Sequence, residues 1–192
     1  PRDAPTGYIG PNRVEILDHN IVYDYRYELI LGTLTQIRAY VRNHTTRPSS
    51  LAFVFKRDRQ GWYYANATDS GWPVPGELQI HSKTRHAQIL SPTFSIRAES
   101  APWLSLNAAF SPDQTNATVC WRCLDQKGFP AAQAQSFKII PDLKFHRYDV
   151  DLAASPAYRG LITQIRFDVF SRINPAATFR MKSVSLGPPP RS

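Results

Sequence analysis

Two stretches near the C-terminal end, Phe145–Leu152 and Tyr158–Val169, limit the possible folds of this chain most strongly. Apolar and polar residues alternate through both stretches, and a turn containing Pro and Gly separates them. Successive side chains of a strand point to opposite faces of a sheet, so such alternation is typical of a half-buried strand. The two stretches therefore predict two strands that each bury one face.

The chain beyond residue 50 continues in the same way, as short apolar segments separated mostly by Gly, Pro, Asn or Asp residues that favour turns. The strands expected from these segments are Leu51–Phe55, Leu78–His81, Ala87–Leu90, Leu104–Phe110, Ala117–Cys123, Gln133–Ile140, His146–Leu152, Ile162–Phe170 and Thr178–Leu186. Many strands at this spacing, with almost no helical periodicity, predict an all-β fold, an antiparallel β-sandwich.

The first fifty residues lie outside this set. Alternation in Tyr23–Leu31 and Ile37–Arg42 predicts two extra N-terminal strands joined at Gly32-Thr33. A helix over residues 25–42 is the alternative, which the glycine and the nearby threonines disfavour. We divide the chain into an N-terminal segment, 1–50, which holds extra strands or the remnant of a preceding domain, a β domain, 51–187, and a Pro-rich tail, 188–192.

Composition fits a packed globular protein. Of the 192 residues, 42% are hydrophobic and 20% are charged. Lys and Arg number 23 against 15 Asp and Glu, a net charge of +8 that makes polyanions plausible partners. The basic residues form no clustered stripe and no apolar run approaches the ~20 residues needed to cross a bilayer, so we expect neither a nucleic-acid nor a membrane partner.

The sequence offers little to an enzyme or to a metal ion. It contains no nucleophile elbow, Walker A loop or zinc-protease helix motif, so no catalytic residues are expected. Cys120 and Cys123 are the only cysteines, and at this spacing on a strand they face opposite sides, roughly 10 Å apart. We expect both to be reduced and mostly packed, with no zinc site.

Six short motifs occur in one order along the chain: Phe53-Val54-Phe55 with Gly61-Trp62, Gly76-Glu77-Leu78 with Ile89–Pro92, Trp103–Leu106, Trp121 with Gly128-Phe129, the Phe145–Leu152 stretch with its following strand, and Thr178–Met181. Together they resemble the galactose-binding-like β-jelly-roll found in carbohydrate-binding modules, over about residues 53–187. The resemblance implies a jelly-roll sandwich that binds sugar and has no catalytic activity of its own.

Several such families hold a structural calcium ion with acidic residues on the first and last strands. In this sequence the corresponding positions are Lys56 and Lys182, and an ammonium group cannot ligate calcium. We therefore expect no metal and no cofactor.

A pyranose ring packs its axial C–H bonds on a flat aromatic face, and anionic sugars add contacts to Arg or Lys. Aromatic residues close to basic ones are accordingly the candidates for ligand binding, although each aromatic could instead be part of the core. The candidates are Tyr64, Trp72, Arg85, Trp121, Arg122, Lys127, Tyr158 and Arg159. In this hypothesis a Trp or Tyr stacks on the sugar, while Arg122, Lys127 or Arg159 holds its anionic group. Whether loops or a concave sheet face carry the site is open.

The sequence thus predicts a carbohydrate-binding module of a secreted or cell-surface protein, which targets a covalently linked catalytic domain to a polysaccharide. The charge favours acidic glycans, with uronate or sulfate groups. The alternative is a structural accessory β-sandwich that braces a catalytic domain and binds no ligand.

Overall fold

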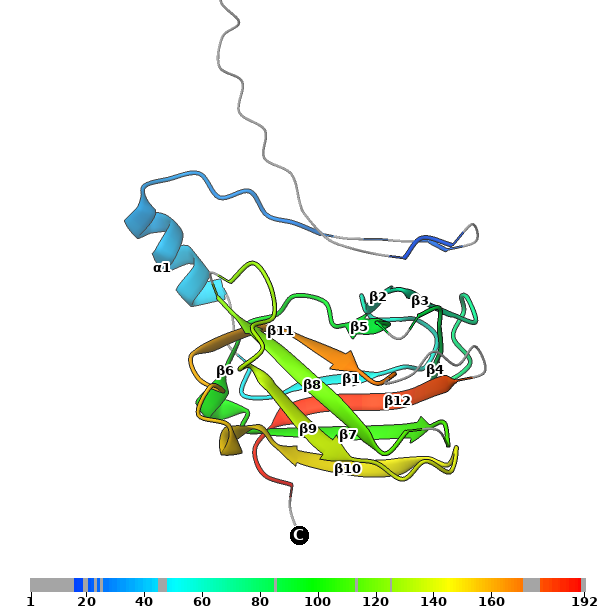
Figure 1. Cartoon of the computed structure of the whole chain (residues 1–192). Helices are drawn as coiled ribbons and strands as arrows, with labels where there is room; N and C mark the ends of the chain where they lie inside the picture. The colour runs from blue at the N-terminus through cyan, green and yellow to red at the C-terminus, as the bar shows by residue number, and fades with distance from the viewer. Residues whose placement is uncertain are drawn as a thin grey trace, which may run out of the picture.

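The structure, a computed structural model, describes residues 16–18, 21–22, 24, 26–44, 48–84, 86–112, 114–124, 126–170 and 177–190. Two antiparallel sheets of six strands each face one another across a shared core (Figure 1). The predicted all-β antiparallel sandwich is therefore confirmed.

Sheet A carries the chain's last strand near its centre, and sheet B is built around the β8–β11 pair. Sheet A consists of β10 (His146–Asp151), β7 (Trp103–Phe110), β12 (Thr178–Gly187), β4 (Leu78–Ser82) and β3 (Ala67–Asp69), with β1 (Leu51–Val54) also paired to β12. Sheet B consists of β2 (Tyr63–Ala65), β5 (Gln88–Leu90), β11 (Leu161–Asp168), β8 (Asn116–Cys123) and β9 (Ala134–Lys138), with β6 (Ile96–Arg97) also paired to β11. Single 3₁₀ turns at Ala98–Ser100 and Leu152–Ala154 follow β6 and β10.

All nine strands expected from the alternating pattern are present, each with ends within two residues of the prediction. Three further strands, β2, β3 and β6, were not predicted. They contain only two or three residues each, too few for an alternating pattern to be recognised in the sequence.

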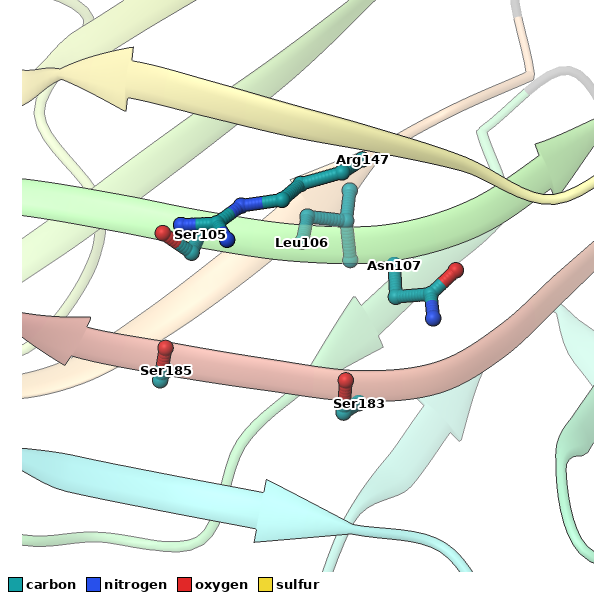
Figure 2. Close-up of a pocket in the computed structure, with 6 residues that line it drawn as sticks. All are labelled: Ser105, Leu106, Asn107, Arg147, Ser183 and Ser185. Carbon is teal, nitrogen blue, oxygen red and sulfur yellow. The ribbon is translucent and has the colours of Figure 1, made fainter. Parts of the chain in front are cut away.

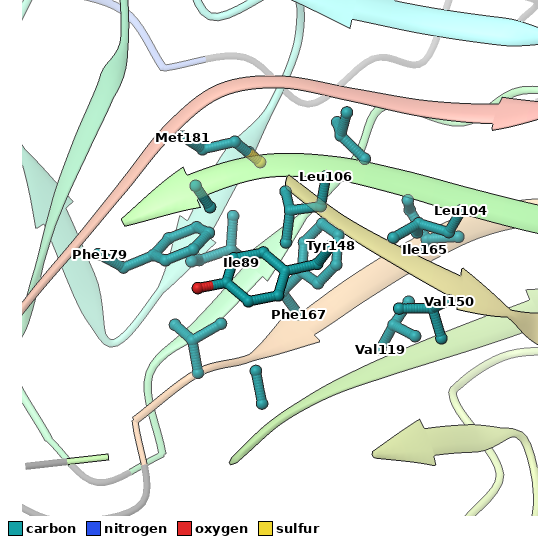
Figure 3. Packing of buried hydrophobic residues seen from close by; sticks show 14 of the residues in the cluster. Ile89, Leu104, Leu106, Val119, Tyr148, Val150, Ile165, Phe167, Phe179 and Met181 are labelled. Carbon is teal, nitrogen blue, oxygen red and sulfur yellow. The ribbon is translucent and has the colours of Figure 1, made fainter. Parts of the chain in front are cut away.

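The core lies between the two sheets and is centred on aromatic rings. Trp62 is fully buried and stacks on Phe167 with 5.9 Å between ring centroids, while Phe53 and Phe55 approach it edge-on. Figure 3 shows side chains of both sheets, such as Leu106 of sheet A and Phe167 of sheet B, pointing into this space. Burial of each such side chain contributes about 1.5–3 kcal/mol to the free energy of folding. The alternating apolar residues of the strands thus stabilise the sandwich.

The N-terminal segment differs from the prediction. Residues 34–44 form an α-helix, α1 (Leu34–His44), and the expected strand at Ile37–Arg42 is therefore wrong. Tyr23 and Tyr25, in the other expected strand, lie outside the described residues, and residues 26–31 carry no strand. None of the α1 side chains is fully buried, and Figure 1 shows the helix beside the sandwich rather than between its sheets.

A capping box starts this helix. The Gln36 amide donates to Thr33 Oγ1 at 3.4 Å, and the Thr33 amide donates to Gln36 Oε1 at 2.8 Å. Such reciprocal bonds satisfy backbone N–H groups that have no partner within the first turn. The pattern of Thr followed three residues later by Gln was visible in the sequence, and it outweighs the low helix propensity of Thr35. Gly32 lies before the helix begins.

We expect Thr33→Ala to destabilise α1 by about 1 kcal/mol, because the helix is exposed and short and draws little support from packing. Amide hydrogen exchange measures this directly: protection should fall for residues 37–44 and stay unchanged in β7 and β11. Unchanged protection in α1 would mean that something other than the cap holds the helix.

Candidate functional site

Two of the predicted stacking residues, Trp121 and Tyr158, belong to the core. Trp121 is fully buried and Tyr158 is 6% exposed, and their rings meet edge-to-face at 5.2 Å. The Trp121 indole donates to the Ala157 carbonyl at 3.2 Å, and the Tyr158 hydroxyl donates to the Ala101 carbonyl at 2.8 Å. Neither ring offers a face to a sugar, so the stacking role expected for them does not fit the structure.

Tyr64 also points inward, and its neighbour Tyr63 takes the outer side of β2. The Tyr64 hydroxyl donates to Asp69 Oδ2 at 3.1 Å, and burial, with the nearby carboxylate, raises the pKa of this phenol. The Tyr63 hydroxyl instead accepts a hydrogen bond from Gln164 Nε2 at 2.9 Å. Alternation from the core residue Trp62 assigns the two tyrosines to these sides, and that signal was available in the sequence.

The other predicted residues fall into separate places. Trp72 is half-buried in the loop between β3 and β4, in sheet A, and Arg85 lies outside the described residues. Lys127 and Arg159 are exposed in the loops that follow β8 and precede β11. The Leu124 amide donates to the Leu161 carbonyl at 2.9 Å, so these loops emerge side by side at one end of sheet B.

Arg122 is the predicted residue that lies on a sheet surface, on the outer face of sheet B. In the β8–β11 ladder Arg122 pairs with Gln164, and Cys120 pairs with Arg166. The neighbouring residues Trp121 and Ile165 point into the core, so these four side chains face outward. The loops that carry Lys127 and Arg159 lie at the same end of sheet B as Arg122. Three predicted basic residues therefore lie in one region.

An aromatic ring from the loop after β8 covers this surface. The Phe129 ring centroid lies 4.8 Å from Arg166 Cζ and 5.9 Å from Arg122 Cζ. We call the surface formed by Tyr63, Arg122, Phe129, Gln164 and Arg166 the basic–aromatic face. Sequence analysis identified only Arg122 of these five as a site residue. Tyr63, Gln164 and Arg166 reach the face from other strands, and the path of a loop brings Phe129 there.

The two arginines of this face differ in their charge partners. Arg166 Nη2 donates to Asp168 Oδ2 at 2.6 Å; burial opposes the charge on Arg166, but the carboxylate outweighs it and raises the arginine pKa. Arg122 has no carboxylate partner in the described part of the chain, and its Nε is buried without a hydrogen bond there.

Both cysteines are free, as predicted. Cys120 lies beneath the same face, with its Sγ 3.4 Å from Arg166 Nη2 and 3.5 Å from Asp168 Oδ2. Burial and the neighbouring carboxylate raise the Cys120 pKa to about 11, so it is a neutral thiol at physiological pH.

Metal ligands do not gather anywhere in the described ranges: no group of three or more His, Cys, Asp or Glu side chains is suitably arranged. Lys56 and Lys182 lie close together, because the Phe55 amide donates to the Lys182 carbonyl at 3.0 Å, and Lys182 Nζ sits 4.3 Å from the Phe145 ring centroid. Within the same ranges, no helix has the length and apolarity to cross a bilayer.

Comparison with known proteins yields matches of structure only. No family model and no curated protein matches the sequence. A low-affinity xylan-binding module, CBM86, from Roseburia intestinalis shares 14% identity at a TM-score of 0.49, over 71% of this chain and 93% of that one. The second N-terminal cellulose-binding domain of Cellulomonas fimi β-1,4-glucanase C shares 13% at 0.44, over 72% and 92%. The family 11 module of Clostridium thermocellum, in complex with a mixed-linked tetrasaccharide, shares 10% at 0.40, over 74% and 91%.

These proteins are carbohydrate-binding modules, and this chain is similar to them in structure. At this identity the likeness concerns the arrangement of the sheets. Which residues of this chain bind a ligand has to be derived from the chain itself.

Proposed function

We propose that this chain is a non-catalytic carbohydrate-binding module that holds an acidic polysaccharide on its basic–aromatic face. The observation that carries the proposal is Arg122, a sheet-borne arginine without a carboxylate partner in the described part of the chain, next to the Phe129 ring. The class of ligand comes from the resemblance of the sequence to carbohydrate-binding modules. The proposed preference for acidic sugars rests on the charge of Arg122, which no carboxylate among the described residues pairs.

In this mechanism Arg122 donates charge-assisted hydrogen bonds to a uronate carboxylate or a sulfate group. Tyr63 and Phe129 supply aromatic surface for the C–H bonds of the sugar ring. Gln164 is 2% exposed and acts as a positioning residue, because its Nε2 bonds both the Tyr63 hydroxyl and, at 2.7 Å, the Ser91 carbonyl. Lys127 and Arg159 extend the positive region along the loops.

The proposal places the module in a secreted or cell-surface protein. Binding to a polymer would keep a covalently linked catalytic domain near its substrate through a raised effective concentration. Nucleic acid and membranes are not among the proposed partners. The alternative, a structural sandwich without a ligand, makes the opposite prediction in the experiment below.

Affinity electrophoresis against polygalacturonate, chondroitin sulfate and neutral xylan tests the proposal. We expect retardation by the acidic polymers that weakens as salt rises from about 0.01 to 0.15 M. Arg122→Ala should weaken binding by about 1.5–3 kcal/mol, or tenfold or more, since it removes hydrogen bonds from a charged group. Arg57→Ala, which removes the same charge from an exposed loop, is the matched control and should bind like the wild type.

Equal retardation by xylan and by the acidic polymers would remove the role of charge from the proposal. Retardation by none of them would favour the structural accessory sandwich instead.

A further inference from the structure

The opposite side of the sandwich carries a second polar surface, on the outer face of sheet A. A hollow of about 330 Å³ opens there between β10, β7 and β12 (Figure 2). Its lining is mostly hydroxyl, amide and guanidinium groups and consists of Ser105, Leu106, Asn107, Arg147, Ser183 and Ser185. We call it the sheet A hollow.

The hollow follows from the strand register. Ser105 lies beside Ser185, and Asn107 lies beside Ser183 in the β7–β12 ladder, while Arg147 of β10 flanks Asn107 on the other side. Small side chains on the two middle strands leave the space that the long arginine borders. The register shifts between Met181 and Ser183, an irregularity of the kind that re-aims side chains at binding surfaces.

The charges at this hollow cancel one another. Arg147 Nε lies 3.0 Å from Asp149 Oδ2, and the Ser105 hydroxyl donates to the same carboxylate. A ligand here therefore meets paired charges and neutral hydrogen-bonding groups. That chemistry suits a neutral ligand rich in hydroxyl groups rather than an anion.

A tryptophan lies on β7 one outward position beyond the residues that line the hollow. Trp103 is the outward residue of β7 that precedes Ser105, and it is half-buried. Its partner in β12 is Gly187, which has no side chain to place against the indole. Successive outward positions on a strand are about 6.6 Å apart, so a sugar ring stacked on Trp103 would have neighbouring rings over the serines.

We infer that the sheet A hollow is a second binding site, which takes a short neutral stretch of polysaccharide. Asn107, Ser183 and Ser185 form hydrogen bonds with the sugar hydroxyls. The Arg147–Asp149 pair lies beside the polysaccharide, and Trp103 stacks on one sugar ring. This inference stands independently of the proposed acidic site. With one site on each outer face, a single chain could engage two polymers, or two regions of one mixed polymer, at the same time.

Chemical-shift mapping by NMR with xylohexaose, cellohexaose and mannohexaose as probes tests the inference. We expect at least one neutral hexasaccharide to shift amide signals of β7, β10 and β12 while leaving those around Arg122 unchanged. Filling the hollow with Ser183→Leu or Ser185→Leu should weaken that binding about tenfold or more. Thr68→Leu, an exposed outward position on the edge strand β3, is the control and should leave it unchanged.

The leucine variants face outward and should keep the wild-type unfolding midpoint. If either fails to fold, Asn107→Ala replaces it as the test, and the mapping on the wild type stands without any variant. Absence of shifts in β7, β10 and β12 with all three probes would overturn the inference. So would unweakened binding by a folded Ser185→Leu or Asn107→Ala protein. Arg122→Ala should bind the neutral probe normally, which separates this site from the acidic one.

Discussion

Asp69→Ala should lower the free energy of unfolding by about 3–5 kcal/mol, because it leaves a charged group buried without its main partner. Arg59 is 2% exposed, and its Nε and Nη2 donate to the two Asp69 oxygens at 2.6 and 2.9 Å. Asp69 also accepts from the Tyr64 hydroxyl and the Gly71 amide. On the other side, Arg59 Nη1 donates to Asp18 at 2.8 Å, which ties the segment before α1 to the sandwich.

Urea denaturation measures the effect, and Asp149→Ala is the matched control. Asp149 also lies about 3.0 Å from an arginine, but that arginine is 62% exposed. Exposed ion pairs contribute about 0–1 kcal/mol, so the control should change stability little. Equal losses in the two variants would show that burial of Arg59 is not the cause.

The Arg59–Asp69 ion pair makes the stability of the protein depend on pH. Burial alone would raise the Asp69 pKa, but Arg59, the Gly71 amide and the Tyr64 hydroxyl together hold it below its ordinary value of 3.8. A carboxyl whose pKa is depressed by folding stabilises the native state above its unfolded pKa, and that contribution is lost as pH falls through the folded value. The stability gap between wild type and Asp69→Ala should therefore be full at neutral pH and shrink below pH 3.8. A gap of constant size down to pH 2 would contradict this account.

Trp121→Ala should also lower the free energy of unfolding, by about 3–5 kcal/mol, as is usual when a large aromatic side chain is removed from a packed core. The indole is fully buried, packs against Tyr158 and satisfies the Ala157 carbonyl. Its neighbour Arg122 points to the other side of the same strand. We expect Arg122→Ala to lose affinity for acidic glycan with little change in stability, and Trp121→Ala to lose stability.

Denaturant midpoints and affinities measured on both variants separate these effects. A Trp121→Ala protein of wild-type stability that no longer binds would place the indole at the ligand and reverse the orientation assigned to β8.

The strands of this fold are largely predictable from the sequence, because alternation and turn residues are local signals. Strand β10 illustrates this, with each buried residue flanked by exposed or half-exposed ones. A helix in the N-terminal segment was only the disfavoured alternative, because Ile37, Ala39 and Val41 alternate as in a strand. Leu34, Ile37 and Val41 also match helical spacing. The capping bond of Thr33 decides between the two patterns.

The candidate site was less predictable, since it depends on which strands become neighbours. Arg122 could be picked out as a basic residue beside a tryptophan, but that tryptophan is in the core. Arg166 and Gln164 join it only through the β8–β11 ladder, which pairs residues far apart in the chain. Phe129 covers the arginines through the path of a loop, for which the sequence carries no periodic signal.

The most direct test of the central claim is NMR mapping of the wild-type chain with a galacturonate hexasaccharide. The account predicts amide shifts concentrated at Arg122, Gln164 and Arg166 and in residues 126–129, with signals of β7, β10 and β12 unchanged. Shifts confined to sheet A, or no shifts at concentrations that saturate acidic-polymer binding in electrophoresis, would contradict it.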